Sequence, residues 1–101
     1  MINIWLDAVN PAPDEFIPTK TAISAISVII HNINKLNTIN IISLDSDSKE
    51  NEQEGYKILS IFEKMKTKHP DFKLPNEIRI HSDKPTARKK MQEIIDNLYN
   101  K

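Results

Sequence analysis

The feature that most constrains this chain is a set of three short apolar runs, rich in isoleucine, that alternate with amphipathic segments. Each run is too short for a helix, and its β-branched residues favour a strand. The runs are residues 2–6, 39–44 and 78–80. A further extended piece is expected at residues 16–18, after a stretch that two prolines exclude from a helix.

Three other segments repeat apolar residues at intervals of three and four, which is the spacing of one buried helix face. They predict helices over residues 21–36, from about Tyr56 to His69, and from Pro85 to Leu98. In the first of them Ile23 and Ile30 are expected to widen the buried face. The alternation predicts an α/β domain over residues 1–101 with a mostly parallel sheet of about four strands. Right-handed crossovers lead us to expect helices on both faces, and therefore three layers.

Composition excludes several classes of function. Fourteen basic and fourteen acidic residues cancel, which argues against generic nucleic-acid binding. The absence of cysteine excludes thiolate chemistry, and a single glycine, Gly55, excludes a glycine-rich phosphate loop. No apolar run approaches the ~20 residues of a membrane span, and no signal-peptide pattern is present, so we expect a cytoplasmic protein.

Polar residues follow each of the three predicted strands. Asp7 ends the first, Asp45 and Asp47 follow the second, and His81 follows the last. In a parallel sheet these positions meet at the carboxyl edge, where ligands bind. Carboxylates brought together there favour a hard divalent cation, so Asp7, Asp45 and Asp47 are the candidate ligands of Mg²⁺ or Mn²⁺.

The start of the last predicted helix is a candidate anion site, because its backbone N–H groups and positive dipole end attract phosphate. The residues that could bind phosphate there are Ser82, Lys84, Thr86 and Arg88. His81 is a candidate acid–base group. The structural alternatives stay open, because Asp and Ser commonly cap helices and a half-buried histidine can simply hold a loop.

These residues belong to motifs that resemble the cyclic-phosphate processing receiver domain, a small family of bacteria and phages. The motifs are LDAVNPAP at residues 6–13, SLDSD at 43–47, Gly55-Tyr56, IHSDKP at 80–85, and the later Arg88 and Met91. The family pattern reads roughly L-D-D-x-R-P-x-P, S-L-D-H-D-L-G, G-Y and H-S-x-N-P. The resemblance implies a receiver-like, truncated flavodoxin-like fold with an acidic divalent-metal pocket that processes or senses cyclic phosphates.

The chain departs from the family pattern at several motif positions. Ala8 replaces a carboxylate, Asn10 an arginine, and Ser46 the histidine between two aspartates. Ser48-Lys49 replaces Leu-Gly, and Lys84 replaces an asparagine. Fewer carboxylates weaken a cation site, and the missing histidine removes an acid–base group, so these departures bear on catalysis more than on the fold.

Three functions follow as hypotheses, and whether the chain is an enzyme is left open. The first is a metal-dependent phosphoesterase or sensor for a phosphate-containing small molecule such as a cyclic nucleotide, with His81, Asp45 and Ser82 as its catalytic residues. The second is an inactive receiver-like module that binds a protein or sequesters a ligand, as a phage-encoded inhibitor would. The third, phosphorelay through Asp45, ranks below them because the fifth strand of a full receiver, with its lysine, is not found in the sequence.

Overall fold

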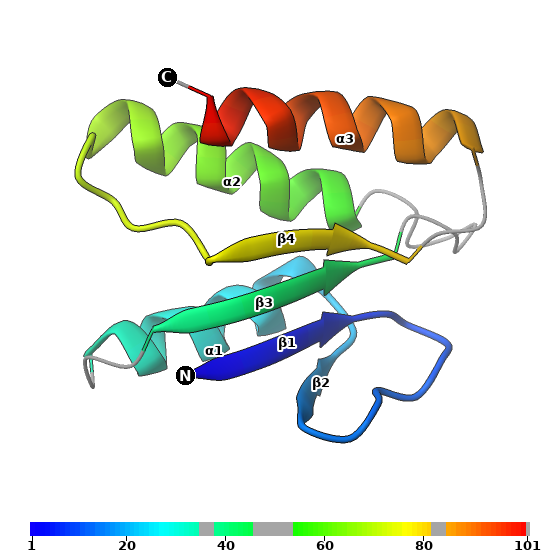
Figure 1. The fold of residues 1–101 in the computed structure, drawn as a ribbon. Coiled ribbons are helices and arrows are strands. Elements are labelled where there is room, and N and C mark those ends of the chain that lie inside the picture. Colours follow the sequence, from blue (N-terminus) through cyan, green and yellow to red (C-terminus); the bar gives the residue numbers. More distant parts are fainter. Residues whose placement is uncertain (35–37, 46–53, 82–84, 101) are drawn as a thin grey trace.

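The computed structural model describes residues 1–34, 38–45, 54–81 and 85–100. Four strands and three helices alternate along these residues (Figure 1). The elements are β1 (Ile2–Leu6), β2 (Phe16–Thr19), α1 (Ala22–Asn34), β3 (Ile39–Leu44), α2 (Glu54–Lys68), β4 (Glu77–Ile80) and α3 (Pro85–Tyr99). The expected strands and helices are therefore present. Glu54, which the sequence places in a polar loop, is instead the first residue of α2.

All four strands are parallel and form one sheet in the order β2-β1-β3-β4. Leu6 pairs with Thr19 on one side and Leu44 on the other, and Leu44 pairs with Ile80. The α/β class, the parallel four-stranded sheet and the truncated flavodoxin-like strand order are confirmed. The register brings the carboxyl ends of all four strands to one edge of the sheet.

The expected cover on both faces of the sheet is not found among the described residues, where the helices form a single layer. Helix α1 packs against β1, β2 and α2, and α2 packs in turn against α3. In Figure 1, α1 lies behind the strands, while α2 and α3 lie beyond β4. The apolar residues of all three helices share one core with alternate residues of the strands, among them Ile4, Leu6, Ile42, Leu44 and Ile78.

Topology explains this single layer. The connections from β2 to β3 and from β3 to β4 both advance in the same direction across the sheet, so right-handed crossovers place α1 and α2 on the same side. The connection between β1 and β2, residues 7–15, contains no helix that could cover the other side. We call that other side, which carries Asn3, Trp5, Ser43, Glu77 and Arg79, the open face.

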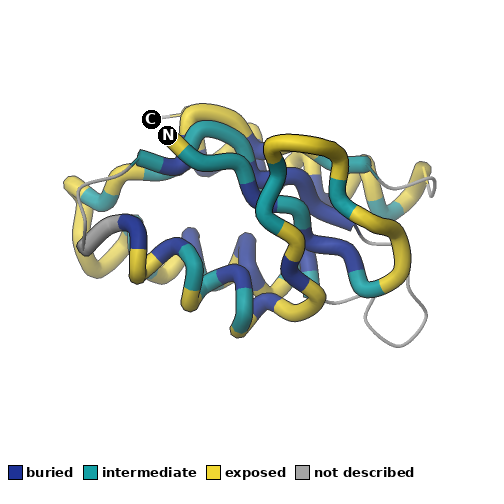
Figure 2. The backbone as a smooth tube through the Cα atoms, turned by 90° about the horizontal axis from the view of Figure 1, so that it is seen from below, coloured by how far each residue is buried: buried dark blue, intermediate teal, exposed yellow. Residues whose placement is uncertain are grey.

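Figure 2 shows the same separation along the chain, with buried positions turned inward and exposed positions on the outer turns of the helices. The expectation for Ile23 and Ile30 was wrong, because they are 79% and 53% exposed. Ala22, Ala25 and Ile29 form the buried face of α1 instead. A helix that packs on one side of a thin two-layer domain needs only a narrow apolar stripe. No helix among the described residues is long and apolar enough to cross a membrane.

Gly55 lies where α2 approaches the end of β3. A Cβ built at this position would lie 2.7 Å from Cε of Met91, 3.1 Å from the carbonyl oxygen of Asp45 and 3.7 Å from Cβ of Leu44. The methionine side chain can move, whereas the backbone of β3 is fixed by its sheet partners. The absence of a side chain at Gly55 therefore lets α2 pack directly against the strand end that carries Asp45.

Neighbouring isoleucines of α1 provide a test of the single helix layer. Ile29 is 4% exposed and Ile30 is 53% exposed. We expect Ile29→Ala to lower the free energy of unfolding by about 2–4 kcal/mol, since it leaves a cavity in the core. The matched control Ile30→Ala should change it by no more than about 0.5 kcal/mol. Urea denaturation followed by circular dichroism measures both, and equal losses would contradict the assigned buried face.

Gly55→Ala tests the contact between α2 and β3. In an exposed helix this change would stabilise by roughly 1 kcal/mol. At Gly55 we expect a net loss of about 1–3 kcal/mol, because the added methyl group overpacks the contact with Met91 and Asp45. Ser60→Ala, at an exposed position of the same helix, is the control and should be nearly neutral. A more stable Gly55→Ala protein would show that α2 does not lie this close to β3.

Candidate functional site

Three strand ends bring Asp7, Asp45 and His81 together at the carboxyl edge of the sheet. Their backbone N–H groups continue the ladder, donating to Thr19, Leu6 and Leu44 at 3.0, 3.0 and 2.9 Å. Side chains alternate between the two faces of a strand, so the residue that follows each inward-facing strand end turns to the open face. Each of the three offers one possible ligand atom, and these atoms lie within 4.8 Å of one another.

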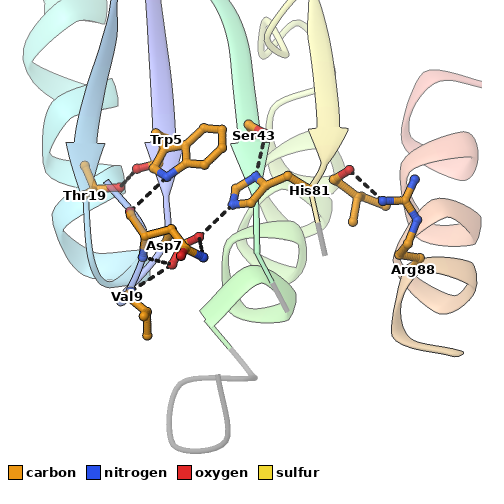
Figure 3. A network of polar contacts seen from close by, with 9 residues as sticks. Trp5, Asp7, Val9, Thr19, Ser43, His81 and Arg88 are labelled. Atoms are coloured by element: carbon orange, nitrogen blue, oxygen red, sulfur yellow. Dashed lines mark hydrogen bonds and ion pairs between the residues drawn. The ribbon is translucent and has the colours of Figure 1, made fainter. Parts of the chain in front are cut away.

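Asp7 is the most constrained member of this group, which we call the edge cluster. Its side chain is 0% exposed, and it accepts four hydrogen bonds. Oδ1 receives the backbone N–H groups of Val9 and Asn10 at 2.8 and 2.9 Å, while Oδ2 receives the Asn10 amide and the His81 ring, each at 3.1 Å (Figure 3). Asp7 thus holds the start of the β1–β2 connection against the end of β4.

His81 lies across the open face with both ring nitrogens engaged. Its Nε2 lies 3.1 Å from Oδ2 of Asp7, and its Nδ1 lies 2.7 Å from Oγ of Ser43. The ring stacks on Trp5, with centroids 3.8 Å apart and planes 7° from parallel. Only 18% of the His81 side chain is exposed. The ring is therefore fixed in position and orientation, with its Nε2 facing Asp7.

The electrostatics of Asp7 follow from these contacts. Burial by itself raises the pKa of the carboxyl group. The donated hydrogen bonds from the backbone and side chain of Asn10, the backbone of Val9 and the His81 ring outweigh burial and hold the pKa of Asp7 below its ordinary value of 3.8. Asp7 is therefore ionised at neutral pH despite its burial.

The other predicted site residues have different outcomes. Asp47, Ser82 and Lys84 lie outside the described residues. Thr86 is exposed in the first turn of α3. Arg88 donates from a guanidinium nitrogen to the carbonyl oxygen of Ile80 at 3.0 Å, and Figure 3 places it on the far side of His81 from Asp7.

The structure adds three residues that the sequence did not mark as part of the site. Trp5 stacks on His81, and its indole N–H donates to the carbonyl oxygen of Asn10 at 3.3 Å. Asn10 holds Asp7, and Ser43 contacts His81. The sequence contained a signal for Ser43, because it is a hydroxyl inside the otherwise apolar stretch Ile41–Leu44. The role of Trp5 could not be read from the sequence, because it depends on the contact with His81.

The edge cluster fits a divalent cation by its donor chemistry. Two carboxylates and an imidazole are ligands that Mn²⁺ accepts, and the carboxylates also suit Mg²⁺. Asp7 is held ionised by fixed donors, so it offers a negative charge at a set position. The residues that would hold the cation are Asp7, Asp45 and His81, and the cation would offset the repulsion between the two carboxylates.

Asp7→Asn tests the electrostatic role of this side chain. A depressed folded-state pKa stabilises the protein above the unfolded pKa, and this stabilisation is lost as the pH falls through the folded pKa. We expect Asp7→Asn to lower the free energy of unfolding by about 2–3 kcal/mol at pH 7. The difference from wild type should shrink as the pH falls from about 5, as urea titrations would show. A pH-independent difference would contradict the ionised state of Asp7, and exposed Asp71→Asn is the control.

Comparison with known proteins agrees with this architecture. No curated protein and no solved structure matches the chain. The sequence model of the cyclic-phosphate processing receiver domain family matches residues 2–97, which is nearly the whole chain and includes all four strands, α1, α2 and all but the last two residues of α3. The chain therefore belongs to the cyclic-phosphate processing receiver domain family.

Proposed function

We propose that the edge cluster binds a divalent cation, Mg²⁺ or Mn²⁺, and with it a phosphate-containing small molecule such as a cyclic nucleotide. The observation that carries the proposal is that possible ligand atoms of Asp7, Asp45 and His81 lie within 4.8 Å of one another at the carboxyl edge. Parallel α/β sheets bind their ligands at this edge. Membership of a family named for cyclic-phosphate processing supports the phosphate part of the proposal.

Charge explains why a cation and a phosphate would bind together. A dianionic pair of carboxylates repels a phosphate, and a bound divalent cation reverses that interaction. The first turn of α3 adds backbone N–H groups and the positive end of its dipole. In this proposal Thr86 and Arg88 contact the phosphate, as do Ser82 and Lys84.

Hydrolysis of a cyclic phosphate is the more specific part of the proposal. Such a reaction depends mainly on positioning a water molecule and neutralising charge on the phosphate, and a bound cation supplies that neutralisation. His81 can serve as a cation ligand or as an acid–base group through the same Nε2, and not as both in one complex. Asp45 and Ser82 complete the proposed catalytic set, with Ser82 contacting the phosphate.

The open face favours a second candidate, an inactive module that binds a protein. Among the described residues no helix covers this face, and Trp5, Phe16 and Ile41 are partly exposed on it. The departures from the family pattern at Ala8 and Ser46 also reduce the charge and the acid–base groups available for catalysis. In this alternative the edge cluster acts as a structural link between β1 and β4.

Binding of Mn²⁺ separates the two candidates. We expect saturable binding of one Mn²⁺ per chain, measured from the free-ion signal in electron paramagnetic resonance. Asp45→Asn should weaken it at least tenfold, since changes even to groups behind the ligands cost about 10–100-fold. Exposed Asp71→Asn is the matched control and should bind Mn²⁺ as wild type does.

A panel of cyclic nucleotides, with and without Mn²⁺, then tests the phosphate part. The proposal predicts binding by calorimetry that requires Mn²⁺ and is lost in Asp45→Asn, and turnover by chromatography would establish the hydrolase. Equal Mn²⁺ affinity in Asp45→Asn and Asp71→Asn would refute the edge cluster as a cation site. Stable capture of a protein partner by the metal-free chain, with no Mn²⁺ binding, would favour the second candidate.

A further inference from the structure

We propose that Ser43 is a positioning residue that lets His81 exchange a proton for a cation at Nε2. The inference rests on the proposed function, because it concerns how the edge cluster becomes able to bind a cation. Ser43 is buried in β3, and its Oγ lies 2.7 Å from Nδ1 of His81. Burial keeps this hydroxyl from acting directly on a ligand in solution, so its effect must pass through His81.

The contacts of Asp7 define the proton on the His81 ring. An ionised carboxylate only accepts hydrogen bonds, so Nε2 of His81 must carry the proton that points to Oδ2 of Asp7. In the neutral ring Nδ1 then has no proton and accepts from the hydroxyl of Ser43. With the ring neutral, Ser43 is thus the donor in the metal-free arrangement.

A cation at the edge cluster needs the opposite arrangement. The lone pair of Nε2 can bind a cation only after its proton leaves, and the neutral ring keeps one proton by taking it up at Nδ1. One proton is lost at Nε2 and one is gained at Nδ1, so the charge of the ring does not change. The hydroxyl of Ser43 then accepts a hydrogen bond from the new Nδ1–H. This change from donor to acceptor is one that an apolar side chain cannot provide.

The same exchange affects Asp7. All four hydrogen-bond positions of its carboxylate are occupied, two by backbone N–H groups, one by the Asn10 amide and one by His81. The amide and backbone donors cannot give up their protons, whereas the imidazole can. Moving the proton of His81 therefore makes two ligand atoms available at once, Nε2 of His81 and Oδ2 of Asp7.

Stacking on Trp5 holds the His81 ring in place while its proton moves. Trp5 lies parallel to the His81 ring at 3.8 Å, and Ser43 and Asp7 hold its two nitrogens from opposite sides (Figure 3). The ring does not need to turn for Nε2 to face Asp7, because it already does. Only the proton moves, and the hydroxyl of Ser43 can accept the hydrogen bond from the new Nδ1–H.

Threonine and valine at position 43 provide a matched pair, since they have the same shape and differ in the hydroxyl. We expect Ser43→Thr to retain Mn²⁺ affinity near that of wild type. Ser43→Val and the smaller Ser43→Ala should weaken it by about 10–100-fold, the effect of removing a partner behind a metal ligand. Circular dichroism melts of all three variants establish that they fold, and Ser43→Ala keeps the test valid if the larger side chains do not fit.

Nitrogen-15 spectra of the His81 ring give a second readout that does not depend on activity. The expected result is a proton on Nε2 in the metal-free protein and on Nδ1 when Zn²⁺, a diamagnetic stand-in for Mn²⁺, is bound. Mn²⁺ affinities of Ser43→Val and Ser43→Ala equal to wild type would overturn the role of Ser43 and leave the cation site standing. Absence of Mn²⁺ binding by wild type would overturn both.

Discussion

The carboxylate of Asp7 is the interaction on which this site depends. It accepts hydrogen bonds from the backbone after β1, from the side chain of Asn10 and from the ring of His81 at the end of β4. None of its side chain is exposed. These contacts link the first strand of the chain to the last, because Asp7 follows β1, His81 follows β4, and the two residues are 74 positions apart. A buried charge is stable only when it is fully hydrogen-bonded, and Asp7 satisfies that condition.

The single helix layer determines where this network lies. With α1, α2 and α3 on one side, the apolar core occupies that side, and the polar groups gather on the open face. A thin domain of this kind leaves His81 and Trp5 partly exposed, while the Asp7 side chain is fully buried. Of the three members of the edge cluster, His81 is the one that is not fully buried, and Ser43 contacts it from within the sheet.

Much of the fold and part of the site could be predicted from the sequence. The short apolar runs and helical spacings gave the strands, the parallel sheet and the strand ends where Asp7, Asp45 and His81 meet. The single layer was missed because sequence periodicity does not show the direction of each crossover. Ile23 and Ile30 were misplaced because a helical stripe has no sharp border when apolar residues occur on both sides of it.

The contacts around His81 could not be predicted, since they join residues from three strands. Trp5 looked like a core residue, and only the sheet register shows that it faces His81. Asn10 looked like a loss, because the family pattern has arginine there, yet its amide and backbone both hold Asp7. The departures from the family pattern thus include a residue with a structural role of its own.

A crystal structure of the chain soaked in Mn²⁺, with anomalous diffraction data, tests the central claim most directly. The account predicts one anomalous peak within bonding distance of Asp7, Asp45 and Nε2 of His81. An anomalous map with no peak at this edge, with His81 still hydrogen-bonded to Asp7, would contradict the account. The contacts of Asp7 and His81 would then be a purely structural link.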